Sequence, residues 1–173
     1  MSAYARDVGV SVPTIKRWLS ILEASYIIFL VSPYHENYGK RIIKSPKVYF
    51  FDTGLVSYLT GITAFEQYNQ GPLAGALFEN YVVSEIYKNE LHTAALSELF
   101  YFRTQDKVEI DLIVDRKATQ DFIEIKKSAT FNPRMIQPLI KYGEKATRRI
   151  LLYIGEKFFY RNVDILSLKD YLG

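Results

Sequence analysis

The sequence has no cysteine and only two histidines, His35 and His92, among its 173 residues. Without cysteine the chain cannot form disulfides, thiolate metal sites or a cysteine nucleophile, and this composition fits a reducing compartment. Two histidines also make a multi-histidine metal site or a serine–histidine triad hard to build. Catalytic or metal-binding chemistry must therefore be sought mainly among carboxylates and lysines.

Long apolar runs are missing as well. The longest nearly apolar run, Tyr26–Val31, is far too short to cross a bilayer, and Met1–Arg6 lacks the apolar stretch of a signal peptide. Apolar residues make up 49% of the chain and aromatic residues 15%, which is enough for the core of one large domain or two small ones. We expect a soluble, cytoplasmic protein with no membrane partner.

The net charge of +3 is small but unevenly distributed. Residues 1–65 carry seven Lys/Arg and four Asp/Glu, whereas residues 66–173 carry fifteen of each. The excess positive charge therefore lies in the first part of the chain, where it permits nucleic-acid binding without requiring it.

Residues 4–22 have the pattern of a helix-turn-helix. Gly9 suits a tight turn, Ser11 can cap the next helix, and Pro13 falls in its first turn. Helical spacing predicts a buried stripe of Ile15, Trp18, Leu19 and Leu22. The outer face, where a recognition helix would meet DNA, carries Thr14, Lys16 and Arg17.

Two strands, Tyr26–Val31 and Lys44–Phe51, are predicted next, with a basic loop between them. With the preceding helices they predict a winged helix-turn-helix domain over residues 1–65. The basic residues at the tip and edge of the wing, predicted to contact DNA, are Lys40, Arg41, Lys44 and Lys47. Alternatively, the domain binds proteins or acts as a spacer, and these residues are ordinary solvated surface.

A short helix, Thr53–Leu59, is predicted with Asp52 as its cap, and Thr63–Pro72 is the predicted boundary between two domains. A longer helix, Gly75–Lys88, follows, with Glu79 in the middle of an apolar arc. A carboxylate in that position is costly unless it is paired. Glu79 therefore either forms a salt bridge or capping contact with a buried group, or points over a sheet toward a functional site.

The second domain, residues 66–173, contains three strands predicted to form an antiparallel meander: Leu99–Arg103, Val108–Asp115 and Phe122–Lys127. Regular alternation in the second strand places Val108, Ile110, Leu112 and Val114 on one face and Glu109, Asp111, Ile113 and Asp115 on the other. Asp111 would then lie beside Glu124, with Lys126 on the same face. The alternative is a pair of surface strands with ordinary cross-strand charge pairs.

Asp111 and Glu124 would bind Mg²⁺ or Mn²⁺, and the Ile125 carbonyl would be a third ligand. Lys126 would orient a metal-activated water or stabilise negative charge on a phosphate. Glu79 would bind a second metal ion or hold a metal-bound water. The predicted catalytic set is thus Glu79, Asp111, Glu124 and Lys126, and its metal ligands are Asp111, Glu124 and Glu79.

The remaining segments complete the second domain. A helix over Asn132–Ala146 is predicted with Asn132 as its cap, and Pro138 predicts a kink or a later start. Arg149–Ile154 suits a buried central strand, and the amphipathic segment Val163–Leu172 would close the domain.

The order of these parts resembles the PD-(D/E)XK nuclease superfamily over residues 73–155: a helix with Glu79, a strand, a strand with Asp111, a strand with Glu124-Ile-Lys126, a helix and a strand. The resemblance implies an α/β (α+β) restriction-endonuclease-like fold, with an αβββαβ core and a mixed sheet, and metal-dependent cleavage of DNA. Ile110 stands where the family's motif has a leading proline. Nucleases of this kind often dimerise, so a homo-oligomer is one expectation.

The whole chain is more closely similar to the C-terminal region of predicted bacterial and archaeal AAA-type ATPases. The matching segments are Ala5–Trp18, Lys44–Leu55, Leu77–Val82, Glu109–Leu112 and Ile123–Lys126. In that family an ATPase domain precedes the winged helix, but this sequence has no Gly-x-x-x-x-Gly-Lys-Ser/Thr loop for ATP. We therefore expect a fragment whose partner is the missing ATPase domain. The chain is either a nuclease or a catalytically inactive DNA- or protein-binding regulatory module of that ATPase.

Overall fold

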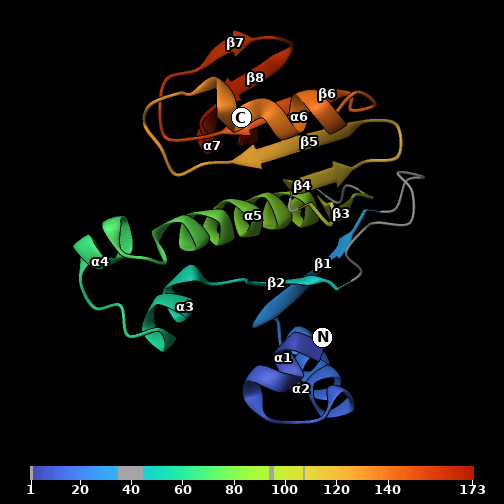
Figure 1. The fold of residues 1–173 in the computed structure, drawn as a ribbon, viewed down its shortest axis with the longest axis vertical. Helices are drawn as coiled ribbons and strands as arrows, with labels where there is room; N and C mark the ends of the chain where they lie inside the picture. Colours follow the sequence, from blue (N-terminus) through green and yellow to red (C-terminus); the bar gives the residue numbers. More distant parts are fainter. Residues whose placement is uncertain (1, 35–44, 94–95, 107) are drawn as a thin grey trace.

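The structure is a computed structural model that describes residues 2–34, 45–93, 96–106 and 108–173 (Figure 1). In this part of the chain, one mixed sheet of eight strands runs in the order β2-β1-β3-β4-β5-β6-β8-β7. The strands are β1 Ile28–Pro33, β2 Lys47–Phe50, β3 Glu98–Arg103, β4 Glu109–Asp115, β5 Gln120–Ile125, β6 Arg148–Leu152, β7 Phe158–Tyr160 and β8 Val163–Leu166. The predicted α/β class with a mixed sheet is confirmed.

Seven α-helices and one 3₁₀ helix accompany this sheet in the described ranges. They are α1 Ser2–Val8, α2 Val12–Ala24, α3 Thr53–Leu59, α4 Phe65–Gln70, α5 Ala74–His92, η1 Pro133–Ile136, α6 Gln137–Tyr142 and α7 Leu168–Leu172. Helices α5 and α7 pack on one face of the sheet, and η1 and α6 pack on the other. The core is accordingly split into two apolar layers, which we call the α5 side and the α6 side.

Helices α1 and α2, separated by a tight turn, lie where the helix-turn-helix pattern was predicted. Gly9 turns the chain with a φ of 75°, and Ser11 caps α2 by accepting a hydrogen bond from the Thr14 amide. The predicted buried stripe is wrong for Trp18, whose residue surface is 46% exposed, whereas Ile15 is buried. Helix α1 has only seven residues, so it covers too little of α2 to bury the indole as well.

Strands β1 and β2 pair antiparallel, but β1 also pairs in parallel with β3. The sheet therefore runs without interruption from the predicted wing into the second half of the chain. Asn80 of α5 further fixes β2, because its side chain accepts from the Phe50 amide at 2.8 Å and donates to the Phe50 carbonyl at 3.1 Å. The boundary between residues 65 and 66 stays a prediction, and helix α4 occupies that segment.

Strands β3, β4 and β5 form the predicted antiparallel meander. Between β3 and β4, Phe100 pairs with Ile113 but Phe102 pairs with Ile110, so β4 has one more residue than β3 between these two pairs. This is a β-bulge, and it resets the alternation of side chains. The predicted facing is therefore wrong for Ile110, which packs with Ile113 on the α6 side instead of with Leu112 on the α5 side.

The last third of the chain follows the prediction, except that one predicted helix is divided into two. Asn132 caps η1, and the expected helix is split so that α6 starts at Gln137, next to Pro138. Strand β6 is central and parallel to both β5 and β8. The end of the chain is β8 followed by α7, and a Ser167–Asp170 capping box starts α7.

Local sequence also explains α5 and α3. Val82, Val83 and Ile86 of α5 are fully buried, as the apolar arc predicts, but Gly75 and Ala76 are exposed at the start of that helix. Asp52 caps α3 through the Gly54 and Leu55 amides, as expected. Within the described residues, no helix has the length and apolar character needed to cross a membrane.

Candidate functional site

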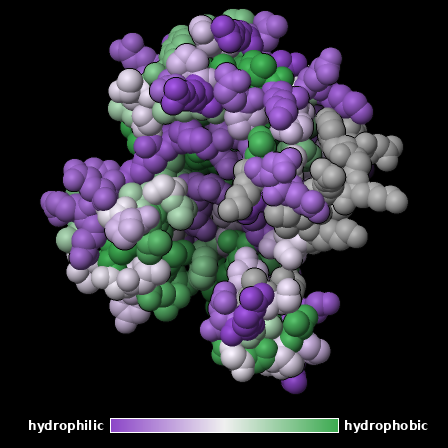
Figure 2. All heavy atoms as spheres, in the orientation of Figure 1, coloured by the Kyte–Doolittle hydropathy of each residue, from purple (hydrophilic) through white to green (hydrophobic). Residues whose placement is uncertain are grey.

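A polar cavity of about 610 Å³ lies where β4 and β5 approach α5, η1 and α6. Hydrophilic residues gather around a recess between α5 and the part of the molecule that holds β5 to β8 (Figure 2). The charged and amide residues that line the cavity are Glu79, Glu109, Asp111, Glu124, Lys126, Arg134, Gln137 and Lys141. The cavity thus has an acidic floor on the sheet and a basic side formed by η1 and α6.

Asp111, Glu124 and Lys126 converge on this floor. The Lys126 ammonium lies 2.5 Å from Glu124 Oε1 and 3.3 Å from Asp111 Oδ2. Residue pairing between β4 and β5 runs from Asp115–Gln120 to Leu112–Ile123. Beyond it, Asp111 Oδ2 accepts from the Ile125 amide at 2.8 Å, so a side chain continues the contact between the strands.

Two further oxygen acceptors lie on this floor. The Ile125 carbonyl accepts from the Lys126 ammonium at 3.1 Å. Glu124 is only 4% exposed, yet its Oε2 atom has no hydrogen-bond partner. A buried carboxylate oxygen without a donor is costly, and a hard cation bound by oxygen ligands would relieve that cost.

Burial controls the protonation of both carboxyls. Burial, and then the nearby charge of Asp111, raises the pKa of Glu124 to about 8, although Lys126 opposes the shift. Burial likewise raises the pKa of Asp111, again against the pull of Lys126. The lysine itself is partly buried, which lowers its pKa, but Asp111 and Glu124 outweigh burial and raise the pKa above its usual value. A positively charged group therefore stays beside two carboxyls that resist ionisation.

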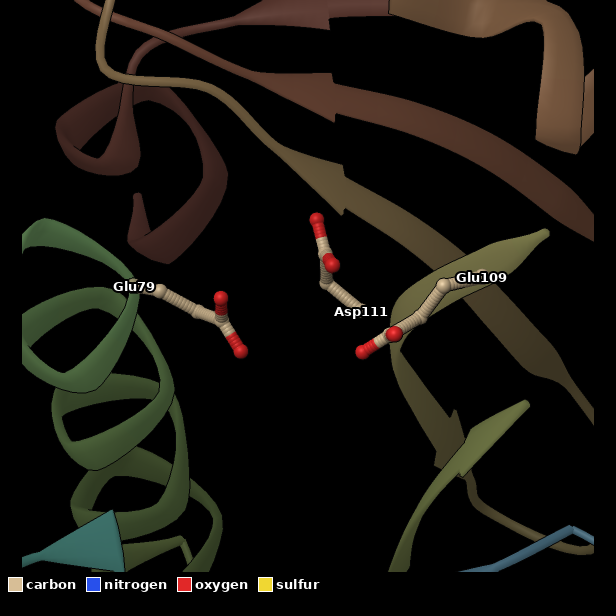
Figure 3. Close-up of side chains that lie close together, drawn as sticks. All are labelled: Glu79, Glu109 and Asp111. Atoms are coloured by element: carbon tan, nitrogen blue, oxygen red, sulfur yellow. The ribbon is translucent and has the colours of Figure 1, made fainter. Parts of the chain in front are cut away.

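A second carboxylate group adjoins the first (Figure 3). Glu79 extends from α5 toward β4, and Glu109 and Asp111 extend from β4 into the same space. One carboxylate oxygen from each lies within 4.8 Å of the others, which is close enough for a shared metal ion. The bulge in β4 brings Glu109 to the α5 side, because it reverses the facing of the residues before it.

Lys47 from β2 enters this second group. Its ammonium pairs with Glu79 at 3.0 Å and also with Glu109, while Tyr49 donates its hydroxyl to Glu79 Oε1 at 2.6 Å. Arg103 of β3 is a second cation on Glu109, at 3.3 Å. Of the two interpretations of Glu79 from the sequence, the structure shows both: an ion pair with a partly buried partner, and a position at the site.

The structure thus gathers the four predicted catalytic residues, Glu79, Asp111, Glu124 and Lys126, around one cavity. Glu109 was not predicted as a site residue, although the alternation of the strand had placed it on the polar face with Asp111. Lys47 was assigned to the edge of a DNA-binding wing, since nothing local in the sequence indicates contact with residues 32 and 62 positions away.

The predicted DNA-binding residues are spread over other parts of the molecule. Lys16 and Arg17 are exposed on α2, and half-buried Thr14 exchanges a hydrogen bond with the Ser11 hydroxyl at 2.8 Å. These three residues do not line the cavity. Lys40, Arg41 and Lys44 lie outside the described residues, and their DNA contacts stay predictions.

Comparison with known families divides the chain in two. Residues 1–66 match a family described as Domain of unknown function (DUF8612). Residues 74–171 match a family described as Domain of unknown function (DUF4143). The chain belongs to the DUF4143 family. The DUF4143 region holds all seven charged residues that line the cavity, whereas Lys47 comes from the DUF8612 region.

Two curated relatives extend the comparison. Uncharacterized protein Mb2031c of Mycobacterium bovis and uncharacterized protein Rv2008c of Mycobacterium tuberculosis are each 33% identical to the chain over 155 residues. The match covers 90% of this chain and 34% of each relative, so the chain spans about a third of their length. No solved structure matches the chain.

Proposed function

We propose that this DUF4143 chain is a DNA-binding, metal-dependent phosphodiesterase module of the nuclease type. The single observation that carries the proposal is the convergence of Asp111, Glu124 and Lys126 beside a buried Glu124 oxygen that has no partner. The order α5-β3-β4-β5-α6-β6 around that site is also the αβββαβ order of the PD-(D/E)XK nucleases that the sequence resembles.

The residues fit Mg²⁺ or Mn²⁺. Asp111 and Glu124 supply carboxylate oxygens, and the Ile125 carbonyl already faces the Lys126 ammonium in the same place. All of these ligands are oxygen atoms, which such ions prefer. When bound there, the ion would supply a water of lowered pKa and positive charge for a phosphate.

The other side chains of the cavity would bind and orient a phosphodiester. Lys126 is 38% exposed in its side chain, so it can leave the carboxylates and donate to a phosphate oxygen or to the attacking water. Arg134 and Lys141 on the opposite wall would contact flanking phosphates of the backbone. In this arrangement, positive charge lies on both sides of a strand of nucleic acid.

The N-terminal region would hold DNA as a winged helix in this proposal. Exposed Lys16 and Arg17 on α2, and the β1–β2 pair, support it. The parallel pairing of β1 with β3 would then fix this region relative to the cavity. Because the chain spans only a third of its relatives, we further propose that an AAA-type ATPase domain is its partner in the longer protein.

Cleavage assays test the proposal directly. Purified protein with Mg²⁺ or Mn²⁺ is expected to cut at least one of linear, supercoiled, single-stranded and branched DNA. Lys126→Ala should abolish cleavage, and Lys88→Ala, which removes a lysine paired with Glu85 on α5, should not. Equal products from wild type and Lys126→Ala on all four substrates would contradict the catalytic assignment.

A second function is favoured by one observation: internal lysines already neutralise the carboxylates. Lys126 forms ion pairs with Asp111 and Glu124, and Lys47 forms ion pairs with Glu79 and Glu109. A site closed in this way would suit a catalytically inactive DNA- or protein-binding module. Thermal unfolding with millimolar Mg²⁺ distinguishes the phosphodiesterase from the inactive module, because a ligand that binds only the folded state raises the melting temperature. An unchanged melting temperature would favour the inactive module.

A further inference from the structure

Lys47 is held in the acidic cluster from several directions. Besides its pairs with Glu79 and Glu109, its ammonium lies 5.3 Å from the ring centre of Tyr101 and 5.9 Å from that of Tyr49. Such distances are typical of cation–π contacts. The lysine is therefore fixed over the cluster by two carboxylates and two aromatic rings, and its side chain is 22% exposed.

The strand that carries Lys47 is fixed as well. Asn80 binds both main-chain groups of Phe50, three residues further along β2. On the other side of Lys47, the Tyr101 hydroxyl donates to the Ser45 carbonyl at 2.5 Å. The ammonium thus reaches the cluster from a strand that is anchored at both ends.

The space that Lys47 occupies suits a single cation. Oxygens of Glu79, Glu109 and Asp111 lie within 4.8 Å of one another, and the ammonium is already 3.0 Å from one of them. A divalent ion on the same carboxylates would lie a few ångströms from a positive charge and be strongly repelled in a partly buried site. The ammonium is paired with Glu79 and with Glu109, and these carboxylates favour its charged form.

We propose that Lys47 is a resident cation of the site: it occupies the position between Glu79 and Glu109 that a second divalent ion would otherwise take. The metal position at Asp111 and Glu124 stays available, because the more exposed Lys126 can leave these carboxylates and one oxygen of Glu124 has no partner. The site therefore takes one metal ion, and the DUF8612 region supplies the second positive charge. This last step rests on the proposed function; the exclusion of an ion by Lys47 does not.

In the proposed reaction, Lys47 would place a permanent positive charge on the α5 side of a bound phosphate, opposite Arg134 and Lys141. In this proposal Glu79 holds Lys47 in place of a second metal ion, since its carboxylate accepts hydrogen bonds from Lys47 and Tyr49. Glu79 and Glu109 then act as positioning residues that hold the lysine.

Metal stoichiometry tests this inference without any cleavage assay. Mn²⁺ binding is measured by titration calorimetry and by the paramagnetic resonance signal of free Mn²⁺ at neutral pH. Wild type is expected to bind one ion per chain and Lys47→Met two, because methionine keeps the apolar stem and removes the charge. Lys47→Arg should bind one, and so should Lys88→Met, the matched loss of a lysine–glutamate pair on α5.

The Lys47→Met variant is expected to fold. Glu79 keeps the Tyr49 hydroxyl, Glu109 keeps Arg103, and both carboxylates reach solvent. Adding Glu79→Gln to Lys47→Met should remove the second ion again, which locates it.

The outcomes separate the two proposals. Two ions on the wild type, or one ion on both wild type and Lys47→Met, would overturn the role of Lys47 and leave the proposed function standing. No ion on the wild type but one on Lys47→Met would support the role of Lys47 and refute the metal site at Asp111 and Glu124. No ion on either protein would refute both.

Discussion

Replacing Glu124 by glutamine tests whether ionisation of this buried carboxyl destabilises the folded protein. Burial, and then Asp111, raises the pKa of Glu124 to about 8 from an ordinary value of 4.5. Between these values the folded chain holds a proton that the unfolded chain releases. The free energy of unfolding of the metal-free protein should therefore fall as pH rises through this window.

The size of the effect follows from the same two values. One proton changes stability by about 1.4 kcal/mol per pH unit. Glutamine cannot ionise, so the stability of Glu124→Gln should not show this fall. The free energy of unfolding of the variant, relative to that of wild type, should therefore rise by about 3 kcal/mol between pH 5 and pH 7.5. The attraction of Lys126 needs no separate allowance, because it is already one of the contributions that set the pKa of Glu124.

Urea unfolding of both proteins across this pH range, with and without Mg²⁺, measures the difference. In wild type, saturating Mg²⁺ should flatten the fall with pH, since a bound cation favours the ionised carboxylate; in Glu124→Gln it should have little effect. Glu85→Gln, which alters a half-exposed glutamate paired with Lys88, should parallel wild type. Parallel curves for Glu124→Gln and wild type would show that Glu124 ionises normally and would refute the reasoning.

Three further substitutions probe the frame of the site. Arg116→Met should cost roughly 3 kcal/mol in urea unfolding, because it strands the buried carboxylates of Glu90 and Asp121; a loss below 1 kcal/mol would argue against that role. Asn80→Ala should cost about 1–3 kcal/mol and speed hydrogen exchange along β2, whereas unchanged exchange would mean that β2 does not depend on this anchor. Ile150→Ala should cost about 2–5 kcal/mol by opening the core while Mn²⁺ binding keeps its stoichiometry, and a change in stoichiometry would contradict the separation of core and site.

Much of the fold was predictable because it depends on local signals. Ser11, Asp52 and Asn132 each cap a helix as expected, since a side-chain acceptor before an apolar run is a nearby physical cue. The meander was also predictable, because its strands are short, alternating and separated by polar turns. The grouping of Asp111, Glu124 and Lys126 followed from that meander alone.

The parts that failed depend on distant contacts. The pairing of β1 with β3 joins segments about 70 residues apart, and no periodicity within either strand indicates it. Trp18 was expected inside because helical spacing shows which residues share a face, but not whether a partner is large enough to cover that face. Lys47 could not be placed with Glu79 and Glu109 for the same reason.

The bulge in β4 makes the site sensitive to the number of residues in the strand. Deleting Leu112, one of the two residues between Ile110 and Ile113, would restore regular alternation and carry Glu109 to the opposite face of the sheet, although every carboxylate would still be present. Relatives that keep the acidic residues but differ in length there would score as similar in an alignment and yet lack the assembled site. Insertions and deletions in this strand are therefore a better guide than percentage identity to which DUF4143 chains share this arrangement of side chains.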